Sequence, residues 1–260
     1  MSIFFKHNKK MTKNRNANSL KNMTRVKHIL QSARHFASGY YNLLLVCLFL
    51  LFIFRPYDRG PLYTSTWKFL LTVMLLSAIF NCNHGKKIKW TATLLAIPTI
   101  TFSWLNMFHY QDLAVIGNCV FTIAFLLICT SSIIYDVVLK ATVTFETLRG
   151  VICAYFMVAF VFASLYFLIE YLIPGSFKHI QREVPYTGLS NYMSEMLYFS
   201  FITLLTIGYG DITPLKDVGQ TAVVIEGMIG QFYVAILVAR LVAVYSLYSN
   251  KGRLSKVRKR

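Results

Sequence analysis

The most unusual stretch of the sequence is TLLTIGYGDITP, which runs from Thr203 to Pro214. Its centre, Gly-Tyr-Gly-Asp, has the composition of a surface turn, yet apolar runs lie directly before and after it. Non-helical backbone is tolerated at membrane depth only where protein buries it or where water bathes it. The stretch meets that condition if it lines a water-filled pore between two membrane spans.

The composition indicates a membrane protein. Of the 260 residues, 56% are hydrophobic and only 14% are charged, whereas soluble domains are about 45–50% apolar and about 25% charged. The net charge of +17 is concentrated at the ends, because residues 1–35 carry nine of the 27 Lys and Arg residues and residues 250–260 carry six. Basic segments beside membrane spans favour a cytoplasmic position near anionic lipid over nucleic-acid binding.

The apolar runs predict the topology, since a spanning helix needs about 20 mainly apolar residues. A shorter apolar stretch, Tyr192–Thr206, is too short to cross and predicts a re-entrant helix. We therefore expect an all-α membrane protein with six transmembrane helices and one re-entrant helix followed by a loop. The six predicted spans are Phe36–Phe54, Leu62–Phe80, Ile88–Phe108, Leu113–Leu139, Arg149–Ile173 and Asp217–Tyr248.

The distribution of Lys and Arg between the short loops predicts the orientation. The second loop carries Lys86, Lys87 and Lys89, whereas residues 106–112 carry no basic residue. With six spans and basic tails, both termini are expected in the cytoplasm, and the protein is expected in the plasma membrane. Arg55 and Arg59 in the first loop are the exception to this pattern.

The motif at the centre of the opening stretch resembles the selectivity filter of potassium channels, T-x-x-T-x-G-Y-G-D. The matching residues are Thr203, Thr206, Gly208, Tyr209, Gly210 and Asp211. The resemblance covers residues from about Arg149 to Tyr248 and implies a tetramer, in which four chains each contribute a loop whose carbonyl oxygens replace the hydration shell of K⁺.

The resemblance also implies roles for individual filter residues. Glycine adopts left-handed backbone angles without steric cost, which accounts for Gly208 and Gly210. The Tyr209 side chain is expected to pack outward against the re-entrant helix, which is the pore helix of this family. Asp211 is expected to concentrate cations just outside the filter. The K⁺ ligands are expected to be the carbonyls of Thr206, Ile207, Gly208 and Tyr209, with the hydroxyl of Thr206.

Residues around the filter have predicted supporting roles. Tyr198 occupies a position near that of a tryptophan in many family members and is expected to reach Asp211. Glu226, the one acid well inside a span, is expected to accept hydrogen bonds from Ser200 or Thr203, or alternatively to tune the cavity charge or sense pH. Gly230, with Gly227 as a second candidate, is expected to be a gating hinge or a close-packing position. Glu170, near the outer end of the fifth span, is expected to bond to backbone behind the filter.

The fourth predicted span has no basic residue between Leu113 and Leu139. Voltage sensors carry regularly spaced arginines, and each gating charge contributes about 2.3 kcal/mol per 100 mV. We therefore divide the chain into a basic cytoplasmic segment at 1–35, a four-helix domain at 36–140 resembling a voltage-sensor scaffold without gating charges, a pore domain at 141–249 and a basic cytoplasmic tail at 250–260.

The sequence thus predicts a potassium-selective channel subunit that assembles as a homotetramer and is not strongly voltage-gated. No organic cofactor, enzymatic activity or nucleic-acid partner is expected. K⁺ ions in the filter and membrane lipids, including anionic lipids at the basic tails, are the expected ligands. The alternatives are a non-conducting regulatory subunit, a weakly selective cation channel and a transporter subunit, although a single chain of that last kind carries four filter-like repeats rather than one.

Overall fold

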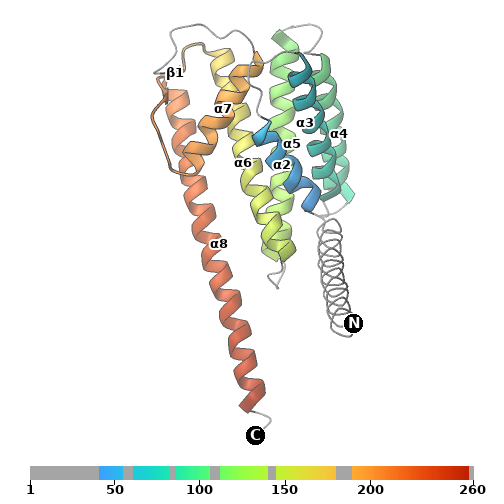
Figure 1. Ribbon diagram of the computed structural model, residues 1–260, viewed down its shortest axis with the longest axis vertical. Helices are drawn as coiled ribbons and strands as arrows, with labels where there is room; N and C mark the ends of the chain where they lie inside the picture. The colour runs from blue at the N-terminus through green and yellow to red at the C-terminus, as the bar shows by residue number, and fades with distance from the viewer. Residues whose placement is uncertain are drawn as a thin grey trace, which may run out of the picture.

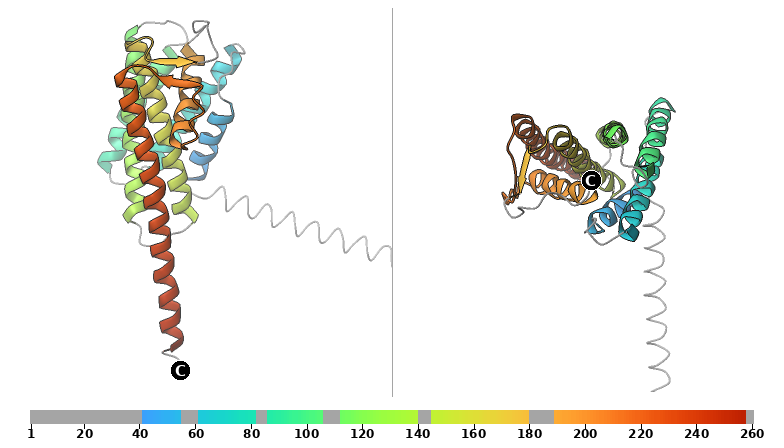
Figure 2. Two further views of the ribbon diagram at one scale, coloured as in Figure 1. Left: turned by 90° about the vertical axis from the view of Figure 1, so that its left-hand side faces the viewer. Right: turned by 90° about the horizontal axis from the view of Figure 1, so that it is seen from above.

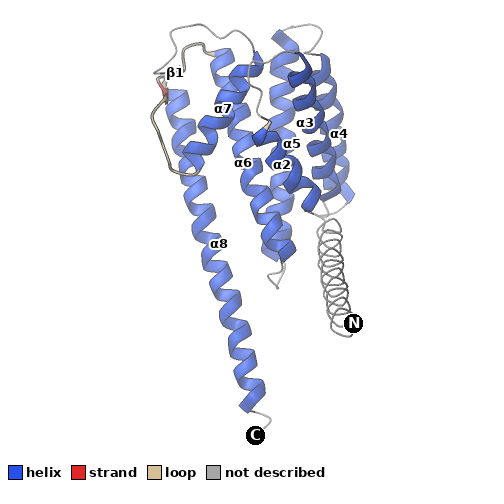
Figure 3. Cartoon of the chain, in the orientation of Figure 1, coloured by secondary structure: helices blue, strands red, loops and turns tan. Residues whose placement is uncertain are grey.

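The computed structural model describes residues 41–54, 61–81, 86–105, 112–139, 145–179 and 189–257. Within them the chain forms seven helices and two short strands, arranged with all the long helices roughly along one axis (Figure 1). Figure 3 shows how little of this part of the chain is strand. The predicted helical fold is confirmed, and the small pair of strands was not expected.

The N-terminal half is a bundle of four helices, each packed on the next. They are α2 (Asn42–Ile53), α3 (Pro61–Asn81), α4 (Lys86–Leu105) and α5 (Asp112–Leu139). Both α2 and α5 also pack against α6 (Phe145–Leu172). Only five residues separate the end of α5 from the start of α6, and the two helices lie side by side along their lengths.

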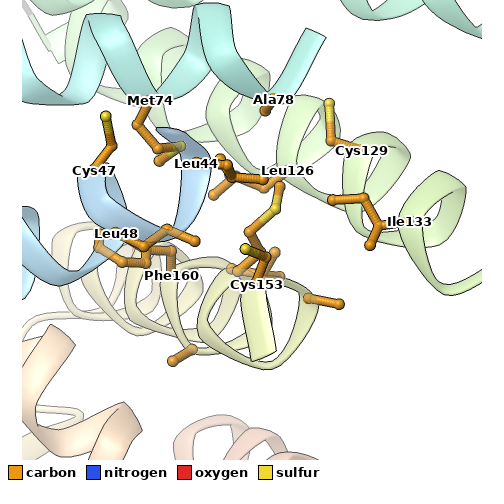
Figure 4. Close-up of a cluster of buried hydrophobic side chains, with 14 of the residues drawn as sticks. Leu44, Cys47, Leu48, Met74, Ala78, Leu126, Cys129, Ile133, Cys153 and Phe160 are labelled. Atoms are coloured by element: carbon orange, nitrogen blue, oxygen red, sulfur yellow. The ribbon is translucent and has the colours of Figure 1, made fainter. Parts of the chain in front are cut away.

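The core lies where α2, α3 and α5 meet α6. Figure 4 shows its side chains pointing toward one another from these four helices. Leu44, Leu48 and Phe125 are fully buried, and so are the thiols of Cys129 and Cys153. These two cysteines therefore act as small apolar core residues.

Three of the helices are long and apolar enough to cross a membrane, over residues 112–137, 145–172 and 217–240. Two further helices are apolar but shorter among the described residues, at 42–53 and 65–81. Twelve residues of α2 rise only about 18 Å, against a hydrocarbon core of about 30 Å. The chain is therefore an integral membrane protein, and its six-span topology remains a prediction.

The C-terminal half comprises α6, the short helix α7 (Leu189–Leu204) and the long helix α8 (Asp217–Val257). The helix α7 contacts both α6 and α8, and it lies beside their upper halves (Figures 1 and 2). The strands β1 (Phe177–His179) and β2 (Ile212–Pro214) pair antiparallel, with Phe177 opposite Pro214. This pairing joins the segment after α6 to the segment before α8.

The helix α8 continues to Val257, beyond Tyr248 where the sequence predicts the last span to end. Its 41 residues correspond to about 60 Å, twice the thickness of a hydrocarbon core. Figure 1 shows its lower part extending beyond the other helices. The predicted basic segment at 1–35 lies outside the described residues.

Candidate functional site

The segment between α7 and β2 has an alternating backbone conformation. Thr206, Gly208 and Gly210 have φ of 58°, 56° and 77°, whereas Ile207 and Tyr209 between them have no positive φ. In an ordinary strand successive carbonyls point to opposite sides, and a left-handed angle at every second residue turns them to one side. The left-handed glycines were expected from the sequence, but the positive φ of Thr206 was not.

A left-handed angle is costly for threonine. Such a conformation costs a residue other than glycine about 1–3 kcal/mol and persists only where the surroundings impose it. Here the N–H of Thr206 donates to the carbonyl of Thr203 at 2.9 Å. Backbone outliers of this kind cluster at functional sites. The outlier at Thr206 therefore marks this segment as a candidate functional site.

The carboxyl end of α7 holds the start of the segment. The last carbonyls of a helix have no partner within the helix, and here the segment supplies one. The carbonyl of Ile202 accepts the N–H of Ile207 at 2.8 Å and that of Gly208 at 3.3 Å. Tyr155 of α6 donates its hydroxyl to the carbonyl of Leu204 at 2.9 Å. The negative end of the α7 dipole therefore lies at the base of the segment, where it favours a cation.

Asp211 fixes the other end of the segment. Its Oδ2 accepts the Tyr198 hydroxyl at 2.8 Å, and its Oδ1 accepts the N–H of Ile212 at 3.1 Å. The first of these is the contact predicted for Tyr198. The β1–β2 pairing begins at the next residue, and the N–H of Leu215 donates to the Ser176 carbonyl at 2.7 Å.

Glu170 connects this outer end to α6. Its two carboxylate oxygens accept the N–H groups of Gly175 at 2.8 Å and Phe177 at 3.0 Å. Gly175 has φ +79°, which permits the tight turn between α6 and β1. Glu170 therefore bonds to backbone as predicted, but its partners belong to the turn that leads to β1.

Glu226 lies behind α7 and connects three helices. Its side chain is completely buried. Its Oε2 lies 2.5 Å from the hydroxyl of Tyr166 on α6, and its Oε1 is in hydrogen-bond contact with Ser200 on α7. The predicted pore helix is α7, and of the two partners predicted on it Glu226 contacts Ser200 and not Thr203. Sequence reasoning missed Tyr166, because no local spacing relates two residues 60 positions apart.

The two candidate hinge glycines face different surroundings. A Cβ at Gly230 would lie 2.8 Å from the carbonyl oxygen of Leu204 and 3.1 Å from its Cδ1, whereas a Cβ at Gly227 would meet nothing within 4 Å. The helix α8 runs through both positions without interruption. Gly230 therefore provides the close packing of α8 against the end of α7, and a hinge at either glycine stays a prediction.

The side chains of the segment are largely exposed in a single chain. The exposed fractions of Leu205, Ile207 and Tyr209 are 51%, 47% and 70%. Because Tyr209 is largely exposed within one chain, its expected packing against the pore helix stays a prediction. The apolar surface of these three side chains is therefore largely uncovered within one chain.

Comparison with known proteins places this site in a family domain. Residues 122–246 match the family described as "Ion channel". Two curated proteins, each called "Protein LctB", are similar to parts of the chain. The one from Geobacillus stearothermophilus is 31% identical over 84 residues, which are 31% of this chain and 59% of the relative. The one from Bacillus caldotenax is 40% identical over 50 residues, 19% of this chain and 37% of the relative.

The chain therefore spans less than two thirds of the length of the curated relatives that it matches. No solved structure matches. The matched residues 122–246 include most of α5, all of α6 and α7, the alternating segment and the membrane-crossing part of α8. The chain therefore contains an ion-channel domain at residues 122–246, and the filter motif of the potassium-channel type lies within it.

Proposed function

We propose that the protein is a potassium-selective channel subunit that conducts K⁺ passively as a homotetramer. The observation that carries this proposal is the alternation of left-handed backbone at Thr206, Gly208 and Gly210. Carbonyls turned to one side form a row of hard oxygen ligands, and rings of four such carbonyls replace the water shell of K⁺ in potassium channels. The K⁺ ligands would be the carbonyls of residues 206–209 and the Thr206 hydroxyl.

The exposed apolar surface supports assembly around a central axis. One chain contains one filter motif, so four chains are needed to complete four-fold coordination. Leu205, Ile207 and Tyr209 are about half exposed or more, and so are Phe232 and Ile236 of α8. Neighbouring copies in a tetramer, together with lipid, would cover this surface.

The surroundings of the pore suit a weakly voltage-dependent plasma-membrane channel. The helix α5 carries no Lys or Arg, and its two acids, Asp112 and Asp136, lie near its ends, so a change in membrane potential acts on no positive gating charge there. The basic residues near both ends favour a cytoplasmic position for the two termini, where anionic lipid would attract them. The four-helix domain α2–α5 then supports the pore laterally, and it reaches α7 where the rings of Phe52 and Phe201 lie 4.9 Å apart.

Recording the purified protein in a planar bilayer tests the proposal, with K⁺ on one side, Na⁺ on the other and stepped voltage. We expect currents that reverse near the K⁺ equilibrium potential, are blocked by barium and change shallowly with voltage. A reversal potential near zero would instead indicate a weakly selective cation channel. Protein that is tetrameric but silent would indicate a regulatory subunit, and a steep conductance–voltage curve would contradict the inference from α5.

Gly208→Ala and Gly175→Ala form a matched pair for this experiment. Both glycines have positive φ, 56° and 79°, and a Cβ at either position would meet nothing within 4 Å. Alanine therefore brings a similar backbone penalty to both positions, but only Gly208 lies in the filter. We expect Gly208→Ala to abolish current or selectivity and Gly175→Ala to keep both. Equal loss in the two variants would contradict the assignment of the filter.

A further inference from the structure

Three hydrogen-bond contacts connect Glu226, Tyr166, Ser200 and the backbone of Ala159, but the hydroxyl groups of Tyr166 and Ser200 together supply only two protons. The Tyr166 hydroxyl contacts Oε2 of Glu226, the Ser200 hydroxyl contacts Oε1, and the same Ser200 hydroxyl lies 2.8 Å from the carbonyl oxygen of Ala159. Each contact needs one proton between its two oxygens. Tyrosine and serine bring one proton each, so one contact of the three lacks a proton if Glu226 is a carboxylate.

A protonated Glu226 supplies the missing proton. The Tyr166 hydroxyl then donates to Oε2, the O–H at Oε1 donates to Ser200, and Ser200 donates to the carbonyl of Ala159. A carboxylic acid is both a donor and an acceptor, whereas a carboxylate only accepts. All three contacts are satisfied in a single direction, from α6 through α8 and α7 back to α6.

The charges around Glu226 support the same assignment. Its side chain is completely buried, and burying an ionised carboxylate is very costly unless a cation or several donors compensate it. No Lys or Arg occurs in α6 after Arg149, in α7, or in α8 before Arg240. The titratable neighbours from α6 are the phenols of Tyr166 and Tyr155, and from α7 the contact is the Ser200 hydroxyl.

We propose that Glu226 is held as a neutral carboxylic acid that relays a hydrogen bond between α6, α8 and α7, and so positions the pore helix behind the filter. The proposal assigns Glu226 a positioning role; it does not contact K⁺. Its protonation state stands independently of the proposed function, whereas its effect on conduction rests on that function.

Infrared spectroscopy of the purified protein at neutral pH measures the protonation directly. A protonated carboxylic acid absorbs at a higher wavenumber than a carboxylate, so the difference between wild type and Glu226→Gln reports the state of this one group. We expect the wild type to show an acid carbonyl band that Glu226→Gln removes. Loss of a carboxylate band in its place would overturn the proposal.

Glu170→Gln is the matched control, because both oxygens of Glu170 accept backbone N–H groups and none of its contacts needs a proton from the acid. This substitution should remove a carboxylate band and leave the acid band. Tyr166→Phe provides a second readout, since losing the hydrogen bond to Oε2 should shift the acid band to higher wavenumber. An acid band that Tyr166→Phe leaves unmoved would contradict the relay.

Bilayer recording then tests the positioning role. Glutamine can donate to Ser200 and accept from Tyr166, so Glu226→Gln should keep the reversal potential of the wild type. Glu226→Ala keeps neither contact and should lose current or selectivity. An acid band in a protein that does not select K⁺ would contradict the proposed function and leave the protonation of Glu226 standing. Equal conduction in Glu226→Gln and Glu226→Ala would contradict only the positioning role.

Discussion

The helices α6 and α8 are alike in hydropathy and unlike in their surroundings. Their most apolar windows have mean hydropathies of 2.4 and 2.0, yet 67% of the α6 window is buried within the chain and only 17% of the α8 window. Hydropathy identifies both as spans and does not distinguish them. The difference shows that α6 is packed by its own chain, whereas most of α8 is left uncovered by it.

Individual residues show the same contrast. Met157 and Tyr166 of α6 are fully buried, whereas Val224 and Phe232 of α8 are 59% and 63% exposed. The stability of one subunit should therefore depend on α6, and the assembly of subunits on α8. Substitutions in the two helices should separate unfolding from assembly.

The largest expected effect comes from Phe160→Ala on α6. Phe160 is 2% exposed, and truncating a buried phenylalanine costs about 3–5 kcal/mol because it removes packing and leaves a cavity. Thermal unfolding of the detergent-purified protein should show a large decrease in Tm. Phe232→Ala on α8 is the matched control and should barely change the Tm of the subunit while reducing the tetramer fraction in size-exclusion chromatography. Equal decreases in Tm for the two variants would contradict the inference that subunit stability depends on α6 more than on α8.

A smaller effect is expected within α8 itself, from Gly230→Ala. The added methyl group would meet the Leu204 carbonyl at 2.8 Å, and overpacking of this kind costs about 1–3 kcal/mol. Because the end of α7 carries the filter, single-channel current should fall while tetramers still form. The measurement is single-channel recording with size-exclusion chromatography of the same sample.

Gly227→Ala is the control for this prediction, since its methyl group would meet nothing within 4 Å. Alanine also favours a helix over glycine by about 1 kcal/mol. We expect wild-type conduction from this variant. A lower open probability in both variants with unchanged conductance would favour a hinge in α8 over close packing at Gly230.

The smallest expected effect comes from Tyr233→Phe, which loosens α8 from α6. The Tyr233 hydroxyl donates to the carbonyl of Val151 at 2.6 Å, and one hydrogen bond contributes about 1 kcal/mol. Tm should decrease slightly, by much less than for Phe160→Ala. A decrease as large as that of Phe160→Ala would mean that α8 depends on its own chain far more than its exposure suggests.

The sequence predicts the local parts of the site well. The filter motif places a turn after a short helix, and both expected left-handed glycines are present, because a run of a few residues determines them. The contact between Tyr198 and Asp211 could also be predicted, since the two residues flank one short loop. The helices of the matched domain could be located from apolar length alone.

Contacts between segments that are distant in sequence were harder to predict. Nothing in the spacing of the residues relates Tyr166 to Glu226 or Phe177 to Pro214, which come together only when α6 and α8 are packed. The positive φ of Thr206 is imposed by the end of α7 and not by the propensity of threonine. The exposure of Tyr209 depends on whether its partner belongs to the same chain, which a single sequence does not specify.

The five-residue connection between α5 and α6 has a consequence for biosynthesis. From α2 to α6 each helix packs on the one made just before it, so these contacts can form in the order in which the ribosome delivers the helices. Contacts between neighbours in sequence also form fastest. The filter motif and α8 follow these helices in the chain, so the packed set α2–α6 can form before the segment that carries the motif is synthesised.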